Sequence, residues 1–211
     1  MSKVEVPIHA ISRYLPAGTD SAVLDYLNRY HVQLTITRKR KTVLGNYTYR
    51  PQSGHHIRIN GDLNPYAFLI TLLHELAHLV AFQSFGSRIQ AHGKEWKNCF
   101  SSLLDVFIFQ KIFPSDIESA LLQSIESPAA SACGDLPLMR ALRLYDNKQS
   151  QTVPVEDLIE GTRFKTEDGR AFIRGKKIRT RYQCQVIPGG QVYLFPGLFE
   201  VSIISDSMPT V

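Results

Sequence analysis

The sequence has few cysteines, no long uninterrupted apolar run and only a small excess of charge of one sign. Its three cysteines, Cys99, Cys133 and Cys184, lie far apart in 211 residues, which excludes a disulfide framework and a four-cysteine metal site. No apolar run approaches the ~20 residues that span a bilayer. The segment Met1–Ala10 carries charge and lacks a signal-type apolar stretch. We therefore expect a cytoplasmic protein with no membrane partner.

The composition, 44% hydrophobic and 20% charged, is that of an ordinary globular protein. The formal net charge of +5 is modest, but the basic residues gather in two places. The first group is Arg38, Lys39, Arg40 and Lys41, and the second includes Arg174, Lys176, Lys177, Arg179 and Arg181. Such groups fit a polyanion partner such as DNA, although a solvated surface is the more frequent explanation of clustered charge.

Hydrophobic periodicity predicts an α+β protein in two parts. The first part, residues 1–118, is expected to combine a small three-stranded antiparallel sheet with several helices. A connector is expected over 119–152 and a small all-β module over 153–211, where short alternating runs are separated by hairpin turn signals. The core candidates of this module are Tyr182, Val186, Tyr193, Leu194 and Phe195.

The sheet is expected from three segments of strand-like pattern, 31–37, 45–50 and 55–60. Helices are expected over 15–30, 66–82 and 94–113. Asn64 and Pro65 form a typical helix start, and the helix that follows them is apolar on nearly all sides. A helix of this kind is buried at the centre of a domain.

This apolar helix contains the pattern HExxH as His74, Glu75 and His78. Residues i and i+4 share one face of a helix, so both imidazoles can reach one metal ion. Glu75 then lies beside the metal, where it can take a proton from a bound water. The alternative, two core histidines and a glutamate satisfied by neighbours, is unfavourable because burying three ionisable groups costs several kcal/mol unless a partner compensates them.

A zinc site with two histidines needs a third protein ligand. The pattern HExxHxxGxxH fails, because Ala81 and Ser84 occupy the positions of its glycine and third histidine. His92 is the one histidine that follows the motif, and Glu95 is the competing ligand. Tyr66, His55 and His56 are the candidates for a second donor to the developing oxyanion.

The segment LLHELAHLVAF, followed by HGKEW, resembles the SprT-like zinc metalloproteases, which include Spartan among their eukaryotic relatives. The resemblance covers roughly Asp20–Phe113 and implies a zincin-like fold. It also implies that His74, His78 and His92 bind one zinc ion and that Glu75 is the catalytic base.

The β module departs from the family, many of whose members carry a four-cysteine zinc ribbon in this region. Here the module keeps only Cys184, so a second zinc is not expected and the cysteine is expected to be a small buried side chain.

The predicted function is therefore that of a zinc-dependent endopeptidase with a protein substrate. The resemblance makes DNA-bound or DNA-crosslinked proteins, and hence DNA repair, the candidate context. The substrate peptide is expected to add as a strand along the edge of HHIRIN (55–60). The alternatives are a nucleic-acid-binding protein with a structural zinc site and a metallopeptidase with no link to nucleic acid. The sequence gives no indication of the oligomeric state.

Overall fold

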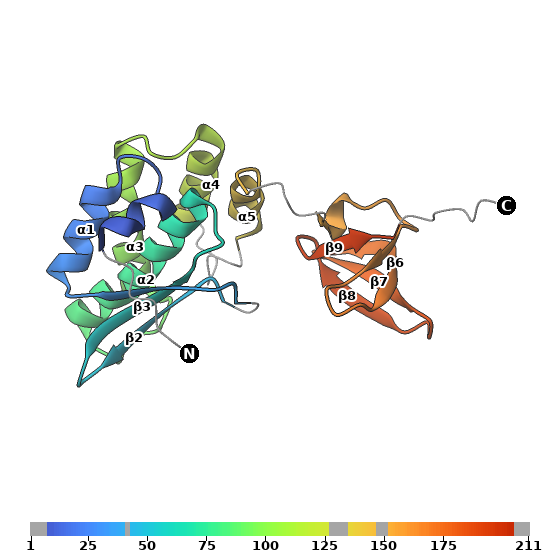
Figure 1. The fold of residues 1–211 in the computed structure, drawn as a ribbon, viewed down its shortest axis with the longest axis horizontal. Helices are drawn as coiled ribbons and strands as arrows, with labels where there is room; N and C mark the ends of the chain where they lie inside the picture. Colours follow the sequence, from blue (N-terminus) through green and yellow to red (C-terminus); the bar gives the residue numbers. More distant parts are fainter. Residues whose placement is uncertain (1–7, 41–42, 127–134, 147–151, 205–211) are drawn as a thin grey trace. The chain divides into compact units, whose positions relative to one another are not determined.

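The computed structural model describes residues 8–40, 43–126, 135–146 and 152–204. It divides the chain into two compact units, Met1–Asp146 and Asn147–Val211 (Figure 1). The division falls inside the segment 119–152, which the sequence indicated as a connector. The first unit is a mixed α+β unit, and the described residues of the second, 152–204, form a large β-sheet with one short 3-10 helix.

The sheet of the first unit has three strands in the order β1-β3-β2. They are β1 (Gln33–Thr37), β2 (Gly45–Arg50) and β3 (Gly54–Asn60). β3 is antiparallel to β2 but parallel to β1, with Leu34 opposite Ile57. The expectation of an antiparallel sheet was therefore wrong for β1.

The order of the strands also corrects the expected site of strand addition. The segment 55–60 lies in β3, which is hydrogen-bonded on both sides and has no free edge. Ile57 and Ile59 are completely buried. Burial of these apolar side chains stabilises the fold most when β3 is central, where helices and neighbouring strands cover it. The edges belong to β1 and β2, whose residues are half-buried or exposed.

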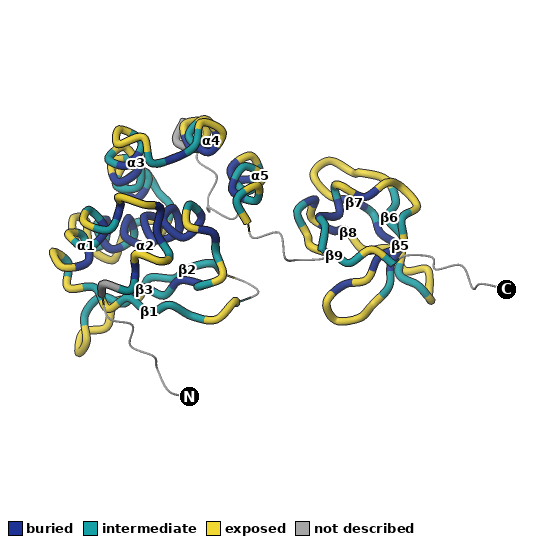
Figure 2. The backbone as a smooth tube through the Cα atoms, turned by 45° about the horizontal axis from the view of Figure 1, so that its top comes forward, coloured by how far each residue is buried: buried dark blue, intermediate teal, exposed yellow. Residues whose placement is uncertain are grey.

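Helix α2 (Pro65–Phe85) is the centre of the first unit, where it packs against β2, β3 and α3 (Figure 2). The other helical segments are η1 (Ile8–Tyr14), α1 (Asp20–Arg29), α3 (Lys94–Phe109), α4 (Ser115–Glu126) and α5 (Leu136–Arg143). Among the described helices, α2 alone is long and apolar enough to cross a membrane, yet 72% of its most apolar stretch is buried inside the protein. α2 is longer than the helix predicted over 66–82, and its burial confirms the predicted core helix.

The start of α2 follows the sequence signal, and its end is set by a glycine. The Asn64 side chain accepts a hydrogen bond from the backbone N–H of Ala67 at 2.9 Å, as expected of an N-cap. The Asn64 amide also donates to the carbonyl of Leu142 at 2.9 Å and to the carboxylate of Asp146 at 2.7 Å. At the other end, Gly86 ends the helix with a φ of 78°, a conformation that favours glycine.

The second unit is a six-stranded sheet in the order β4-β9-β5-β6-β7-β8, with antiparallel pairs throughout its described ladders. The strands are β4 (Val153–Pro154), β5 (Arg163–Lys165), β6 (Ala171–Ile178), β7 (Arg181–Ile187), β8 (Val192–Pro196) and β9 (Glu200–Ile203). The 3-10 helix η3 (Val155–Asp157) follows β4.

The core of this unit confirms part of the prediction. Tyr182 and Phe195 are buried and Val186 packs against them, and Cys184 is fully buried as expected. Tyr193 and Leu194 were wrong, since they are 39% and 49% exposed. Both lie in the edge strand β8, where Phe195 is the one buried residue, so alternation along the strand did not predict which of its side chains are covered.

Candidate metal centre

The structure brings His74, His78 and His92 together. One potential ligand atom from each lies within 4.8 Å of the other two. His74 and His78 are one turn apart on α2, whereas His92 comes from the segment between α2 and α3. Gly93, the residue after His92, donates to the carbonyl of Gln90 at 2.9 Å, and this turn directs the chain into α3. Glu95, the competing ligand, is not part of the group.

The electrostatics of the three imidazoles suit a metal ion. Burial lowers the pKa of His74 to about 3 and that of His78 to about 4, with the neighbouring histidines adding to the effect. Burial also lowers the pKa of His92. The three rings are therefore neutral near pH 7, and the neutral imidazole is the form that binds metals.

The positions of the ring nitrogen atoms in this group are compatible with a bound metal ion. The Nε2 atoms of His74 and His92 lie 3.2 Å apart, a separation that suits two nitrogen ligands of one tetrahedral ion at Zn–N distances of about 2 Å. The other ring nitrogen of His74, Nδ1, is buried and has no hydrogen-bond partner in the described part of the chain. Three converging imidazoles match the donors of zinc sites that keep one open position.

Glu75 lies against β2 on a neighbouring face of α2 and is only 6% exposed. Burial raises the pKa of its carboxyl to about 7, while the backbone N–H of Tyr47 and the charge of Arg40 act in the opposite direction. The carboxylate is therefore held by the main chain of the edge strand. At this position it is a base whose strength matches neutral pH.

Gly45 makes this close approach of β2 possible. A Cβ atom on Gly45 would lie 2.7 Å from Cγ2 of Thr71 and 2.9 Å from Oε1 of Glu75. Real side chains do not tolerate such distances, so any other residue here would displace the carboxylate or the strand. This role of Gly45 was not predicted from the sequence, although a glycine inside a strand is a known signal of close backbone approach.

The candidates for a second oxyanion donor lie in other surroundings. His55 interacts through Nδ1 with the hydroxyl of Tyr47 at 2.9 Å and through Nε2 with Gln83 at 3.1 Å. His56 interacts through Nε2 with the hydroxyl of Ser53 at 2.7 Å. Tyr66 packs on Tyr145, with ring centroids 5.0 Å apart. None of these three candidates is part of the histidine group.

The first basic group is only partly free. Arg40 donates hydrogen bonds to the side chains of Asn46 and Asn60 and to the carbonyls of Leu44 and Arg58. These bonds hold the segment after β1 against the sheet, so its guanidinium is not a solvated phosphate ligand. Arg38 and Lys39 are exposed, and Lys41 lies outside the described residues.

The second basic group lies on the β6–β7 hairpin. Arg174 and Lys177 lie over the ring of Tyr182, with their charged ends 4.6 Å and 5.7 Å from its centroid. Lys176, Arg179 and Arg181 are exposed. Phe164, Phe172 and Tyr182, the aromatic residues interleaved with these cations in the sequence, are core residues of this unit.

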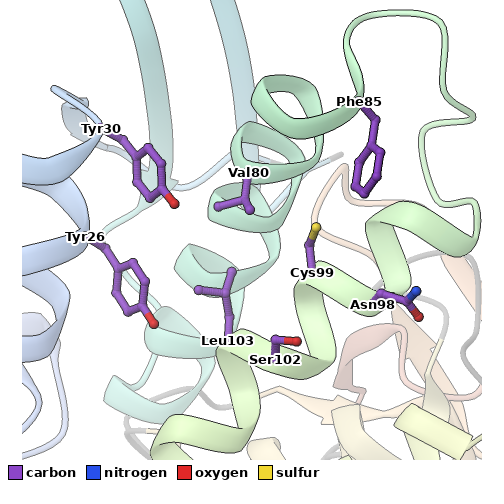
Figure 3. A pocket seen from close by; sticks show the side chains of 8 residues that line it. All are labelled: Tyr26, Tyr30, Val80, Phe85, Asn98, Cys99, Ser102 and Leu103. Atoms are coloured by element: carbon purple, nitrogen blue, oxygen red, sulfur yellow. The ribbon is translucent and has the colours of Figure 1, made fainter.

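A pocket of about 260 Å³ opens between α1, α2 and α3 (Figure 3). Its lining residues are Tyr26, Tyr30, Val80, Phe85, Asn98, Cys99, Ser102 and Leu103. None of them belongs to the histidine group. Val80 follows His78 by two residues and therefore points about 200° away from it around the helix.

Comparison with protein families matches residues 17–114 to the SprT-like family. Curated relatives named Protein SprT match over a short stretch. One from Pseudomonas putida is 70% identical over 27 residues, one from Pseudomonas entomophila 67% and one from Pseudomonas fluorescens 63% over the same length. The stretch covers 13% of this chain and 16% of the relative's length in each case. No solved structure matches the chain.

Proposed function

Because residues 17–114 of the chain are a SprT-like domain, we propose that the protein is a zinc-dependent endopeptidase. In this proposal His74, His78 and His92 hold the ion and Glu75 is the general base. The observation that carries it is the convergence of three neutral imidazoles, two from α2 and one from the segment after it, beside the buried Glu75 of the same helix. A structural zinc site is usually closed by four protein ligands and has no use for a buried carboxylate of this kind.

The chemistry follows from the positions of these side chains. When bound, zinc supplies Lewis-acid activation of a water molecule and of the scissile carbonyl. Glu75 takes the proton of the attacking water on its carboxylate and then returns it to the leaving nitrogen. A raised pKa favours both transfers, because a stronger base removes the proton more readily and the resulting acid can still release it near neutral pH.

The substrate backbone is placed along β2 in this proposal. β2 is an edge strand of the sheet, and the N–H of Tyr47 within it holds Glu75. An extended peptide that adds to the free edge of β2 would run beside the base and the histidine group. Edge-strand addition supplies affinity through the main chain.

DNA-bound or DNA-crosslinked proteins are the proposed substrates. From Gly169 to Phe199 the second unit has no acidic residue, and this stretch contains the exposed Lys176, Arg179 and Arg181. A basic surface of this kind holds single-stranded DNA through its phosphates. It would keep the protease near proteins that are attached to the same strand.

Cleavage of a DNA-binding protein by the zinc-loaded full chain tests both parts of the proposal. The reaction is run with and without single-stranded DNA, and the Glu75→Gln variant is the blank. Cleavage that requires Glu75 and is stimulated by DNA supports the endopeptidase and its DNA tether. Cleavage that ignores DNA removes the tether and keeps the peptidase. No cleavage, with one zinc bound per chain, would favour a nucleic-acid-binding protein with a structural zinc.

A further inference from the structure

We propose that Trp96 is a positioning residue that holds the three imidazoles in their converging arrangement and so sets the affinity of the site for its metal. This inference rests on the proposed function, because it assigns a role toward the same ion. Trp96 is the only tryptophan of the chain. It lies in the first turn of α3, four residues after His92, which directly precedes the N-cap residue Gly93 of that helix.

The indole contacts every member of the histidine group. Its ring centroid lies 4.6 Å from that of His74, 5.2 Å from that of His78 and 4.7 Å from that of His92. Trp96 is only 2% exposed. A single rigid side chain therefore touches imidazoles from both sides of the turn between α2 and α3.

A second aromatic residue supports the indole. Phe100, one turn further along α3, stacks on Trp96 with a centroid distance of 5.0 Å and an interplanar angle of 20°. It also contacts His74 at 5.7 Å, edge to face. The pair forms a continuous aromatic layer behind the group, and closely packed rings of this kind have few alternative rotamers.

The outer ring nitrogen of His74 is not oriented by a hydrogen bond within the described residues. The outer nitrogen of a metal-binding histidine usually donates to a carboxylate or a carbonyl, which fixes the ring. At His74 the outer nitrogen Nδ1 has no such partner among the described residues, and neither does Nε1 of Trp96. Packing against the indole is therefore what fixes the orientation of this ring.

The unpaired indole N–H gives the inference a sharp control. Burying a donor without a partner is unfavourable, so the N–H adds nothing to the site and the flat aromatic surface is the useful part. Phenylalanine has a flat aromatic surface and no N–H, whereas leucine fills space but has no flat aromatic surface. Trp96→Phe should therefore preserve the site and Trp96→Leu should not.

The experiment measures zinc affinity by chelator competition on the full chain, for the unaltered protein and for Trp96→Leu, Trp96→Phe and Phe107→Leu. Phe107 is fully buried on the same helix. In the described part of the chain the histidine rings contact Trp96, Phe100 and one another but not Phe107, so this variant reports a general packing loss. We expect Trp96→Leu to weaken zinc binding by about 10- to 100-fold, the range found for residues that orient metal ligands. Trp96→Phe and Phe107→Leu should stay within about 3-fold of the unaltered protein, because they keep an aromatic surface or leave the site intact.

The visible absorption of the Co²⁺-loaded proteins provides a second readout, since it reports ligand geometry rather than stability. It should change in Trp96→Leu and be retained in Trp96→Phe. Unchanged zinc affinity in a folded Trp96→Leu variant would overturn the inference while leaving the proposed function intact, and so would an equal loss in Phe107→Leu. An unaltered protein that binds no zinc would overturn both.

Discussion

Helix α2 and the β6–β7 hairpin place their ionisable residues in opposite surroundings. On α2, His74 and Glu75 are buried in the core, at 8% and 6% exposure. On the hairpin, Lys176, Lys177 and Arg179 are exposed to solvent. Burial shifts the pKa values of the α2 groups strongly.

Buried and exposed charged residues differ in how strongly they indicate a function. A buried ionisable group destabilises the fold unless something compensates it, so the α2 residues point to a bound ion and to chemistry. Exposed cations cost almost nothing, so their clustering is compatible with DNA binding and equally with a plain solvated surface. Changes in the two regions should accordingly differ in kind and in size.

The largest effect is expected from His92→Ala. Removing one of three imidazoles leaves too few ligands for zinc, so affinity should fall by more than about 100-fold, beyond the usual loss for an outer partner. Peptidase activity should disappear with it. Zinc content after dialysis measures the change, and His56→Ala, which removes a histidine outside the group, should retain one zinc per chain.

A smaller effect is expected from Gly45→Ala, which tests the close approach of β2 to the base. The new Cβ would displace the carboxylate of Glu75, and a misplaced catalytic group costs about 10- to 100-fold in rate. We expect kcat to fall while zinc content is unchanged. The matched control is Thr48→Ala, which alters an exposed residue of the same strand. Equal kinetics of the two variants would show that Gly45 has no such role.

Replacing the three exposed hairpin cations, Lys176, Lys177 and Arg179, by glutamine should leave peptide cleavage unchanged. It should weaken single-stranded DNA binding and reduce the log–log salt slope by about 2, since each phosphate contact contributes about 0.7. The control removes the same charge from the first unit, at Arg29, Arg88 and Lys94. If both triple variants lose DNA affinity equally, net charge and not the hairpin is responsible.

The smallest effect is expected from Leu194→Ser on the edge strand β8. Because this side chain is 49% exposed, its loss should change the free energy of unfolding by no more than about 0.5 kcal/mol. By contrast, Phe172→Ala, in the core of the same unit, should cost about 3–5 kcal/mol. Urea denaturation measures both, and a large loss in Leu194→Ser would mean that a partner surface covers β8.

Local patterns predicted the elements better than their pairing. The apolar run after Asn64 and Pro65 predicted a buried central helix, and α2 is that helix. The parallel pairing of β1 with β3 could not be predicted from either strand, because it depends on which strand lies in the middle of the sheet. Ile57 and Ile59 of β3 are fully buried there, and this burial depends on the helices that cover the sheet.

In the candidate site, too, the residues of a local motif were predicted, whereas contacts between distant segments were not. HExxH and the single downstream histidine singled out the three residues that the structure brings together. The parts that surround them, Gly45 against Glu75 and Trp96 against the imidazoles, join segments between 4 and 30 residues apart. Their roles depend on how β2 and α3 lie against α2, which no short motif encodes.

The cap of α2 has a practical consequence for anyone who wishes to express a shorter protein. Through its amide, Asn64 is hydrogen-bonded to Leu142 and Asp146, which lie well beyond residue 114, where the match to the SprT-like family ends. A fragment trimmed to the family boundary would remove α5 and expose the first turn of the helix that carries His74 and Glu75. The smallest autonomous fragment should therefore extend to Asp146, where the first compact unit ends.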